Sequence, residues 1–144
     1  MVEIREALPN DAQAIAKLNH SQMGYNFSAE DTYKRLCIIL SSEKDKIFVA
    51  TIDGEVVGYV HANDYDLVYC DHMKNIMGIA VDGQVKRQGV GRLLMNAVET
   101  WARNTNASGI RLVSGATRTV AHEFYRRCGF GDEKAQINFR KGFD

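Results

Sequence analysis

The chain has 144 residues, of which 45% are hydrophobic and 25% charged. These are the proportions of one ordinary globular domain, so an intrinsically disordered chain is excluded. The 18 basic and 18 acidic side chains cancel, which argues against a nucleic-acid-coating protein. The cancellation hides a split, because residues 1–83 carry 7 basic and 13 acidic side chains and residues 84–144 carry 11 and 5. We therefore expect a ligand or partner with a preferred pole.

The compartment follows from what the sequence lacks. No apolar run approaches the roughly 18 residues that cross a bilayer, and the charged first residues do not resemble a signal peptide. The cysteines, Cys37, Cys70 and Cys128, are odd in number and widely spaced, which is typical of reduced thiols. We expect a cytoplasmic protein without membrane contact or metal. No repeat or linker interrupts it, so residues 1–144 are predicted to form a single domain.

The first thirty residues predict a strand followed by two helices. Residues 2–7 alternate apolar and charged side chains, as a strand with one buried face does. Pro9-Asn10-Asp11 then provides helix-start chemistry. Ser28 is predicted to cap a second helix, with Asp31 at its third position.

The middle of the chain predicts a hairpin and a buried strand. Residues 46–52 and 55–61 are strand-like and are separated by Asp53-Gly54, which tolerates the positive φ of a two-residue turn. Residues 63–72 are polar and irregular, and we interpret them as a surface loop or an edge strand. Residues 75–81 are a candidate for a buried strand.

The last third of the chain returns to alternating helices and strands. A long helix is indicated by an apolar stripe made of Val90, Leu93, Leu94, Ala97, Val98 and Trp101. A strand over residues 110–114, a helix over 119–128 and a final strand over 136–141 are predicted to follow. This order around a central hairpin indicates a mixed α/β sheet.

The turn before the long helix has the composition of a phosphate site. It reads Lys86-Arg87-Gln88-Gly89-Val90-Gly91-Arg92. Two glycines let a ligand approach the backbone, and the first N–H groups of a helix favour an anion. The alternative is a glycine turn with solvated basic residues. The turn lacks the third glycine of the dinucleotide motif and the Gly-Lys-Ser/Thr of a P-loop, so alone it does not decide.

A second motif lies over residues 118–130. Ala121, Phe124, Tyr125 and Cys128 recur at helical spacing, and Gly129 follows as a helix stop. We interpret Phe124 and Phe130 as core residues. Tyr125 lies on a different face from Phe124 and can present its hydroxyl.

Taken together, these segments resemble the GNAT superfamily of N-acetyltransferases. The matching pieces are the strand over residues 76–81, the turn over 87–94 and the motif over 121–130, and the opening Ile4-Arg5-Glu6-Ala7 also fits. The resemblance implies a mixed, mostly antiparallel sheet of about six to seven strands with a splayed parallel pair, flanked by about four helices. It also implies acetyl transfer from acetyl-CoA to a primary amine by direct attack in a ternary complex.

The resemblance also assigns roles to residues. The pantetheine arm of acetyl-CoA would lie along the first splayed strand, its pyrophosphate would lie on the glycine turn, and Tyr125 would donate a proton to the departing sulfur. The implied acetyl-CoA-binding residues are Ile79, Ala80, Val81, Lys86, Arg87, Gln88, Gly89, Val90, Gly91, Arg92, Arg118, Ala121 and Phe124. Two positions depart from the family pattern: Lys86 replaces a planar glutamine or arginine, and Arg118 replaces an asparagine.

The general base is the open point. Many relatives carry a glutamate on the strand before the turn, where this sequence has Asn75. His122 lies within the second motif and is expected to pack or cap. The remaining candidates, besides bulk water, are His61, His72, Asp64, Asp66 and Asp71. Structural roles for His61, at a strand end, and for His72, at the surface, are the simpler interpretation.

The acceptor and the partners stay open as well. Residues 24–31 and 63–72 would flank the acceptor, and an acidic, tyrosine-bearing rim suits a cationic amine. Polyamines, aminoglycoside-like drugs, amino acids and protein or peptide amines are all compatible, and a homodimer through the final strand is open. A non-catalytic acyl-CoA-binding sensor or interaction module is the alternative function. A nucleotide- or nucleic-acid-binding domain is disfavoured.

Overall fold

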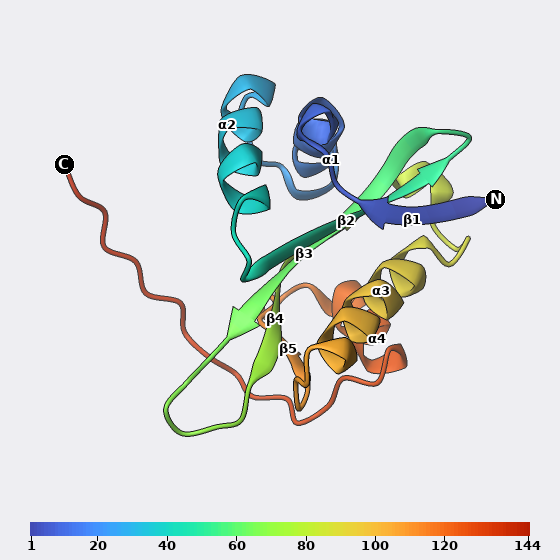
Figure 1. Ribbon diagram of the computed structural model, residues 1–144. Coiled ribbons are helices and arrows are strands. Elements are labelled where there is room, and N and C mark those ends of the chain that lie inside the picture. The colour runs from blue at the N-terminus through green and yellow to red at the C-terminus, as the bar shows by residue number, and fades with distance from the viewer. The chain divides into compact units, whose positions relative to one another are not determined.

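The strands and helices follow one another largely as the hydrophobic pattern predicts. A computed structural model describes all residues from Met1 to Asp144, in two compact units, Met1–Leu112 and Val113–Asp144 (Figure 1). The elements of the first unit are β1 (Val2–Glu6), a 3-10 turn η1 (Pro9–Asp11), α1 (Ala12–Met23), α2 (Ala29–Leu40), β2 (Asp45–Ile52), β3 (Glu55–Tyr65), β4 (Met73–Val81), η2 (Gly83–Val85), α3 (Val90–Asn104) and β5 (Ile110–Leu112). The second unit contains α4 (Thr119–Arg127).

The helix starts that the sequence predicts are both confirmed. The Ser28 hydroxyl accepts a hydrogen bond from the Asp31 amide at 3.0 Å and so caps α2. The Asp11 carboxylate accepts from the Leu8 amide at 2.8 Å and forms an ion pair with Arg5, also at 2.8 Å. The hydrogen bond from Arg5 lowers the pKa of the Asp11 carboxyl. This pair fixes the end of β1 to the start of α1.

The sheet has five strands in the order β1-β2-β3-β4-β5, so the expected six to seven strands are wrong. All neighbours are antiparallel except β4 and β5, which are parallel. The hairpin prediction is confirmed, since Asp53 and Gly54 both have positive φ, at 51° and 82°. Residues 63–65 extend β3, so only residues 66–72 form the predicted loop.

Helices cover both faces of the sheet. Figure 1 shows α1 and α2 on one face and α3 on the other. Ile47, Val49 and Tyr59 belong to the core beneath α1 and α2. On the α3 face, a Cβ at Gly58 would lie 3.2 Å from a Val90 methyl carbon, so glycine permits the close approach of α3. Because strand side chains alternate, odd positions of this part of β3 face α1 and α2, and even positions face α3.

The parallel pair is short. β4 pairs with β5 only from Lys74 to Ile76, opposite Ile110 to Leu112. A bulge follows at Met77, because Ile76 pairs with Ala62 on β3 and Gly78 pairs with the preceding His61. Beyond that point β4 continues to Val81 with β3 on one side and no strand on the other. The predicted parallel pair is thus present and ends abruptly.

The second unit departs from the prediction at its end. Gly129, with φ of 96°, follows α4 as the predicted helix stop. Residues 136–141 are not a strand, and Ile137 and Phe139 are 79% and 86% exposed. Alternating side chains alone do not make a strand, because the backbone groups of a strand need a neighbouring strand as hydrogen-bond partner. Residues 136–141 have no such neighbouring strand in the chain. No helix in the structure is long and apolar enough to cross a membrane.

Candidate active site

The turn between β4 and α3 presents backbone N–H groups. Arg87 and Gly89 both have left-handed backbone, with φ of 75° and 79°. The residue that precedes α3 is Gly89, which has no side chain to cap the helix. The amides of Gly89, Val90 and Gly91 therefore have no acceptor in the protein. Together with the helix dipole they form a site for an anion such as a phosphate.

The charges around this turn are positive. Lys86, Arg87 and Arg92 are exposed, and neither Lys86 nor Arg87 has a carboxylate partner. The first turn of α3 contains no acidic residue. The predicted pyrophosphate-binding residues of this segment are thus brought together, with Gln88 also exposed beside them and Val90 buried.

The strand that leads to the turn has a free edge. The Asp82 amide donates to the Val57 carbonyl of β3 at 2.8 Å. Because backbone groups of a strand point to alternate sides, Ile79 and Val81 direct theirs away from β3, where β5 no longer follows. Ala80, between them, is 4% exposed and pairs with Tyr59. Unpaired strand groups at this edge can bind an extended, amide-bearing ligand such as the pantetheine arm.

The second unit holds the other predicted residues. Tyr125 is 9% exposed, and its ring centroid lies 5.6 Å from that of Phe124 and 6.1 Å from that of Phe130. Burial raises the pKa of Tyr125, whereas the positive charge of Arg118, the residue preceding α4, acts in the opposite direction. The hydroxyl is therefore protonated at neutral pH, as a proton donor must be.

Packing within this unit differs in part from the prediction. Phe124 and Phe130 are only half-buried, as is Ala121, and Tyr125 is the buried ring. His122, expected to pack or cap, lies with its Nε2 2.9 Å from the Gly115 carbonyl oxygen and so links α4 to the segment before it.

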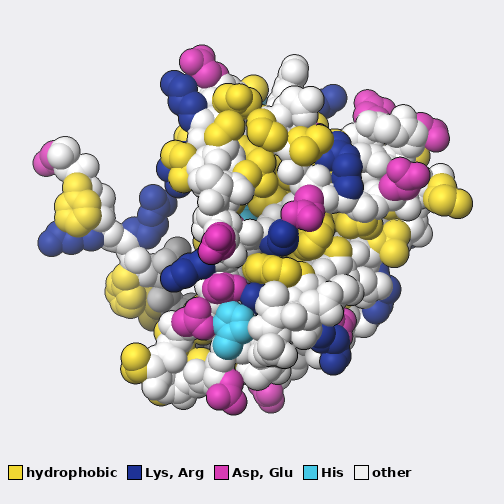
Figure 2. Space-filling view, in the orientation of Figure 1, with side chains coloured by type: hydrophobic (Ala, Val, Ile, Leu, Met, Phe, Trp, Pro, Cys, Tyr) yellow, Lys and Arg dark blue, Asp and Glu magenta, His cyan; other side chains and the backbone are white.

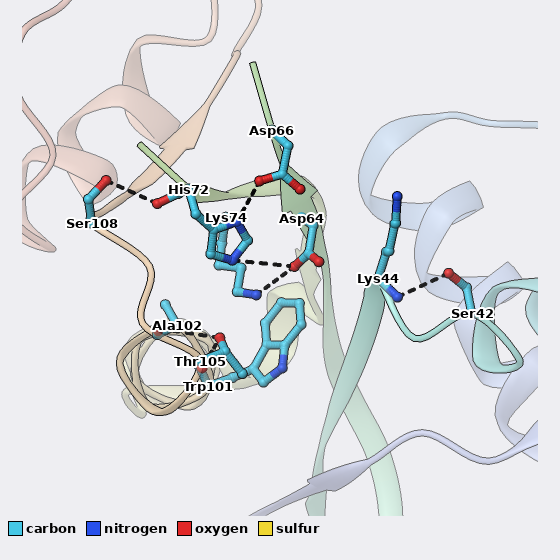
Figure 3. Close-up of polar contacts among 10 residues, drawn as sticks. All are labelled: Ser42, Lys44, Asp64, Asp66, His72, Lys74, Trp101, Ala102, Thr105 and Ser108. Atoms are coloured by element: carbon cyan, nitrogen blue, oxygen red, sulfur yellow. Dashed lines mark hydrogen bonds and ion pairs between the residues drawn. The ribbon is translucent and has the colours of Figure 1, made fainter. Parts of the chain in front are cut away.

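Asp64, one of the candidate bases, is paired with a buried lysine. Asp64 faces α3, where its carboxylate lies 2.5 Å from the ammonium of Lys74 (Figure 3). Lys74 is 2% exposed, and its Nζ also lies 3.9 Å from the ring centroid of Trp101. A cation that is so deeply buried requires this carboxylate. Asp64 is therefore paired with Lys74 on the α3 face of the sheet.

The two candidate histidines lie in different surroundings. His72 is held between carboxylates, with Nδ1 2.7 Å from Asp66 and Nε2 3.8 Å from Asp64 (Figure 3). Asp71 is exposed in the loop. His61 lies on the opposite face, with Nε2 2.7 Å from Asp45 of β2. His61 borders a cavity.

That cavity lies between α1, α2 and the sheet and has a volume of about 190 Å³. Most of its walls are apolar, and His61 and Tyr59 are its contribution from β3. The sequence alone does not reveal this cavity. Tyr59 and His61 occupy alternate positions of β3, so the sequence indicates that they share one face of the sheet. The other walls come from helices, and how these helices pack on the sheet cannot be predicted from local sequence.

Comparison with known proteins identifies the family. The sequence profile of the acetyltransferase (GNAT) family matches residues 12–130. The chain belongs to the GNAT family. An aminoglycoside N(6′)-acetyltransferase of Stenotrophomonas maltophilia is 31% identical over 142 residues, which cover 95% of this chain and 91% of that protein. An N-alpha-acetyltransferase of Sulfurisphaera tokodaii is 28% identical over 91% of this chain and 81% of that protein.

Solved structures share the fold. An aminoglycoside N-acetyltransferase in complex with CoA superimposes with a TM-score of 0.85 at 22% identity, over 98% of this chain and 95% of that one. A transcriptional regulator from Bacillus halodurans has a TM-score of 0.88 at 19% identity, over 98% and 100%. This GNAT protein is an acetyl-CoA-dependent N-acetyltransferase with an amine acceptor. Nothing favours the non-catalytic alternative.

The buried pair of Lys74 and Asp64 gives a stability prediction. Asp64→Asn leaves the Lys74 charge buried and unpaired, so we expect the free energy of unfolding to fall by about 3 kcal/mol or more. Asp66→Asn, just after β3 and 60% exposed, should cost less than about 1 kcal/mol. Urea unfolding measures both. Equal losses would contradict the role assigned to Asp64.

Proposed function

We propose that the protein acetylates the primary amine of a small molecule and that residues 1–144 act as one catalytic domain. The family match supports the single domain, because residues 12–130 include parts of both compact units. Enzymes that act on aminoglycosides among the relatives support a small-molecule acceptor. With three free thiols and no membrane-spanning helix, the cytoplasm is the proposed location.

One observation carries the proposed acetyl-CoA site: a strand with a free edge leads into an uncapped, positively charged helix start. Residues 79–81 would hold the pantetheine arm through the backbone. The free amides of Gly89, Val90 and Gly91 would hold the pyrophosphate, with Lys86, Arg87, Gln88 and Arg92 around it. The family resemblance supports Arg118, Ala121 and Phe124 of the second motif as further proposed acetyl-CoA-binding residues.

The proposed chemistry is direct transfer. The lone pair of a neutral amine attacks the thioester carbonyl carbon, the C–N bond forms, the C–S bond breaks, and the nitrogen releases one of its two protons to solvent. Tyr125, which is protonated at neutral pH, donates a proton to the sulfur and is reprotonated from solvent. Holding both reactants in place supplies several kcal/mol of the barrier, up to about 7–11 in ideal cases.

The basic turn predicts a salt-dependent loss of affinity. Replacing Lys86 and Arg87 together by glutamine should weaken CoA binding about threefold to tenfold at low salt, and by less at high salt, where exposed charges are screened. Arg103→Gln, at the other end of α3 and paired with Glu99, is the matched control and should leave affinity unchanged. Calorimetry at two salt concentrations measures this. Unchanged affinity in the double variant would refute the pyrophosphate assignment.

Tyr125 predicts a loss of turnover without a loss of binding. Tyr125→Phe should lower kcat about 100-fold, because the thiolate leaves without its proton donor, while CoA affinity stays as in the wild type. Tyr33→Phe, on the exposed side of α2, serves as the control. Release of free CoA thiol across a panel of amines, peptides and proteins gives the rate and the acceptor class. Full turnover in Tyr125→Phe would exclude the acid role.

A further inference from the structure

The free edge of β4 begins beside a glycine. β5 pairs with β4 as far as Ile76, the bulge lies at Met77, and Gly78 is the first residue after it. The φ of Gly78 is not positive, so the backbone there does not require a glycine. A Cβ at Gly78 would have only the Tyr59 hydroxyl oxygen, at 3.8 Å, within 4 Å beyond its chain neighbours. The face of β4 toward α1 and α2 therefore has room for a carbon atom at this point.

The wall of this space is the end of the Tyr59 side chain, which reaches across from β3. Tyr59 pairs with Ala80, and its hydroxyl extends diagonally over β4 toward Gly78. His61, the direct partner of Gly78, turns its ring instead to Asp45 of β2. Tyr59 is thus the β3 side chain that limits the space over Gly78.

Tyr59 is held firmly in this position. Its hydroxyl donates a hydrogen bond to the Asn19 side-chain oxygen of α1 at 2.5 Å, and the residue is 8% exposed. Burial raises the pKa of Tyr59 to about 12, so the hydroxyl stays neutral and keeps its proton for Asn19. Helices α1 and α2 cover this face, and Figure 2 shows apolar side chains gathered over them. The wall therefore cannot move aside without breaking a buried hydrogen bond.

The proposed acetyl-CoA site, on which this inference rests, brings the thioester to the same point. With the pyrophosphate at the start of α3, the pantetheine arm runs back along β4 past Val81 and Ile79. β5 closes the edge at Ile76, so the arm ends between Ile79 and Ile76, next to Gly78. On the other face of the strand, α3 packs against the sheet (Figure 1). An acyl chain that leaves the edge toward α1 and α2 therefore crosses Gly78.

We propose that the space over Gly78 receives the acyl group and that Tyr59, fixed by Asn19, limits its length, so that the enzyme selects acetyl-CoA over propionyl-CoA and longer donors. The methyl of an acetyl group fits over a residue that has no side chain. Each further methylene is directed at the Tyr59 hydroxyl, which is held in place. One methylene more or less in a fitted pocket changes selectivity about 10-fold to 200-fold. Tyr59 acts here on donor specificity and takes no part in proton transfer.

The test uses two substitutions that change this space in opposite directions. The measured quantity is the ratio of kcat/KM for propionyl-CoA to kcat/KM for acetyl-CoA, with the best amine of the panel as acceptor in every assay. The wild type should prefer acetyl-CoA about 10-fold or more. Gly78→Ala fills the space with a methyl group at ordinary contact distance and should lower the ratio at least about threefold. Tyr59→Phe removes the hydroxyl oxygen and should raise the ratio at least about threefold.

Each variant has a matched control. Gly83→Ala also adds a methyl group with ordinary contacts, 3.6 Å from the Gln22 side chain, but lies beyond the end of β4. Tyr65→Phe removes a hydroxyl from the same strand as Tyr59, where the ring contacts Arg111. Both controls should leave the ratio unchanged. Gly78→Ala should also bind free CoA as the wild type does, because CoA carries no acyl group.

Each outcome decides a different point. Equal use of acetyl-CoA and propionyl-CoA by the wild type overturns the acyl assignment and leaves the proposed function intact. Equal losses with both donors in Gly78→Ala, or no change in either, also overturn it. If Tyr59→Phe does not fold, Gly78→Ala decides alone, since its methyl meets no close contact. A wild-type protein that transfers neither acyl group to any amine refutes the proposed function, and the inference falls with it.

Discussion

The backbone of β4 has a strand partner on both sides for only three residues. From Lys74 to Ile76 it is held by β3 and β5, and after the bulge at Met77 it is held by β3 alone. Strand N–H and C=O groups need partners, so an edge that opens inside a sheet is a place where another molecule can bind. The rest of the first unit is arranged around this opening.

Two glycines, Gly58 on β3 and Gly78 on β4, leave space on the two faces of the sheet beside this free edge. Gly58 on β3 lets Val90 and Leu94 of α3 approach the sheet, which fixes the helix whose N-terminus carries the free amides. Gly78 presents no side chain on the face of β4 toward α1 and α2, where a Cβ would lie 3.8 Å from the Tyr59 hydroxyl. The free edge of β4 is therefore continuous along the chain with the anion site at the start of α3.

The zero net charge conceals two uses of charge. Acidic side chains of the first 83 residues bind cations or a histidine of the same unit, as Asp11 does with Arg5, Asp45 with His61 and Asp64 with Lys74. Lys86 and Arg87 have no such partner and are available to a ligand. The positive half of the sequence thus carries unpaired basic side chains at an anion site, whereas Asp11, Asp45 and Asp64 of the acidic half are paired within the fold.

Local signals predicted local structure. The Ser28 cap and the Asp53-Gly54 turn each depend on neighbours in the sequence and are confirmed, and the stripe of α3 is buried at Val90, Leu94 and Val98 but exposed at Leu93. Tertiary features were not accessible in this way. Asp64 reads as a loop carboxylate until the register of β3 turns it toward Lys74, and residues 136–141 have the alternation of a strand without a partner to pair with. The cavity beside His61 depends on where two helices pack.

Amide hydrogen exchange with and without CoA tests whether the free edge of β4 and the start of α3 form the acetyl-CoA site. The account predicts that CoA slows exchange at Ile79 and Val81 on the free edge of β4 and at Gly89, Val90 and Gly91 before and within the first turn of α3. Val49, fully buried in β2, serves as the unaffected reference. If CoA binds and leaves these five amides exchanging as before, the half-paired strand is not the cofactor site and the account is contradicted.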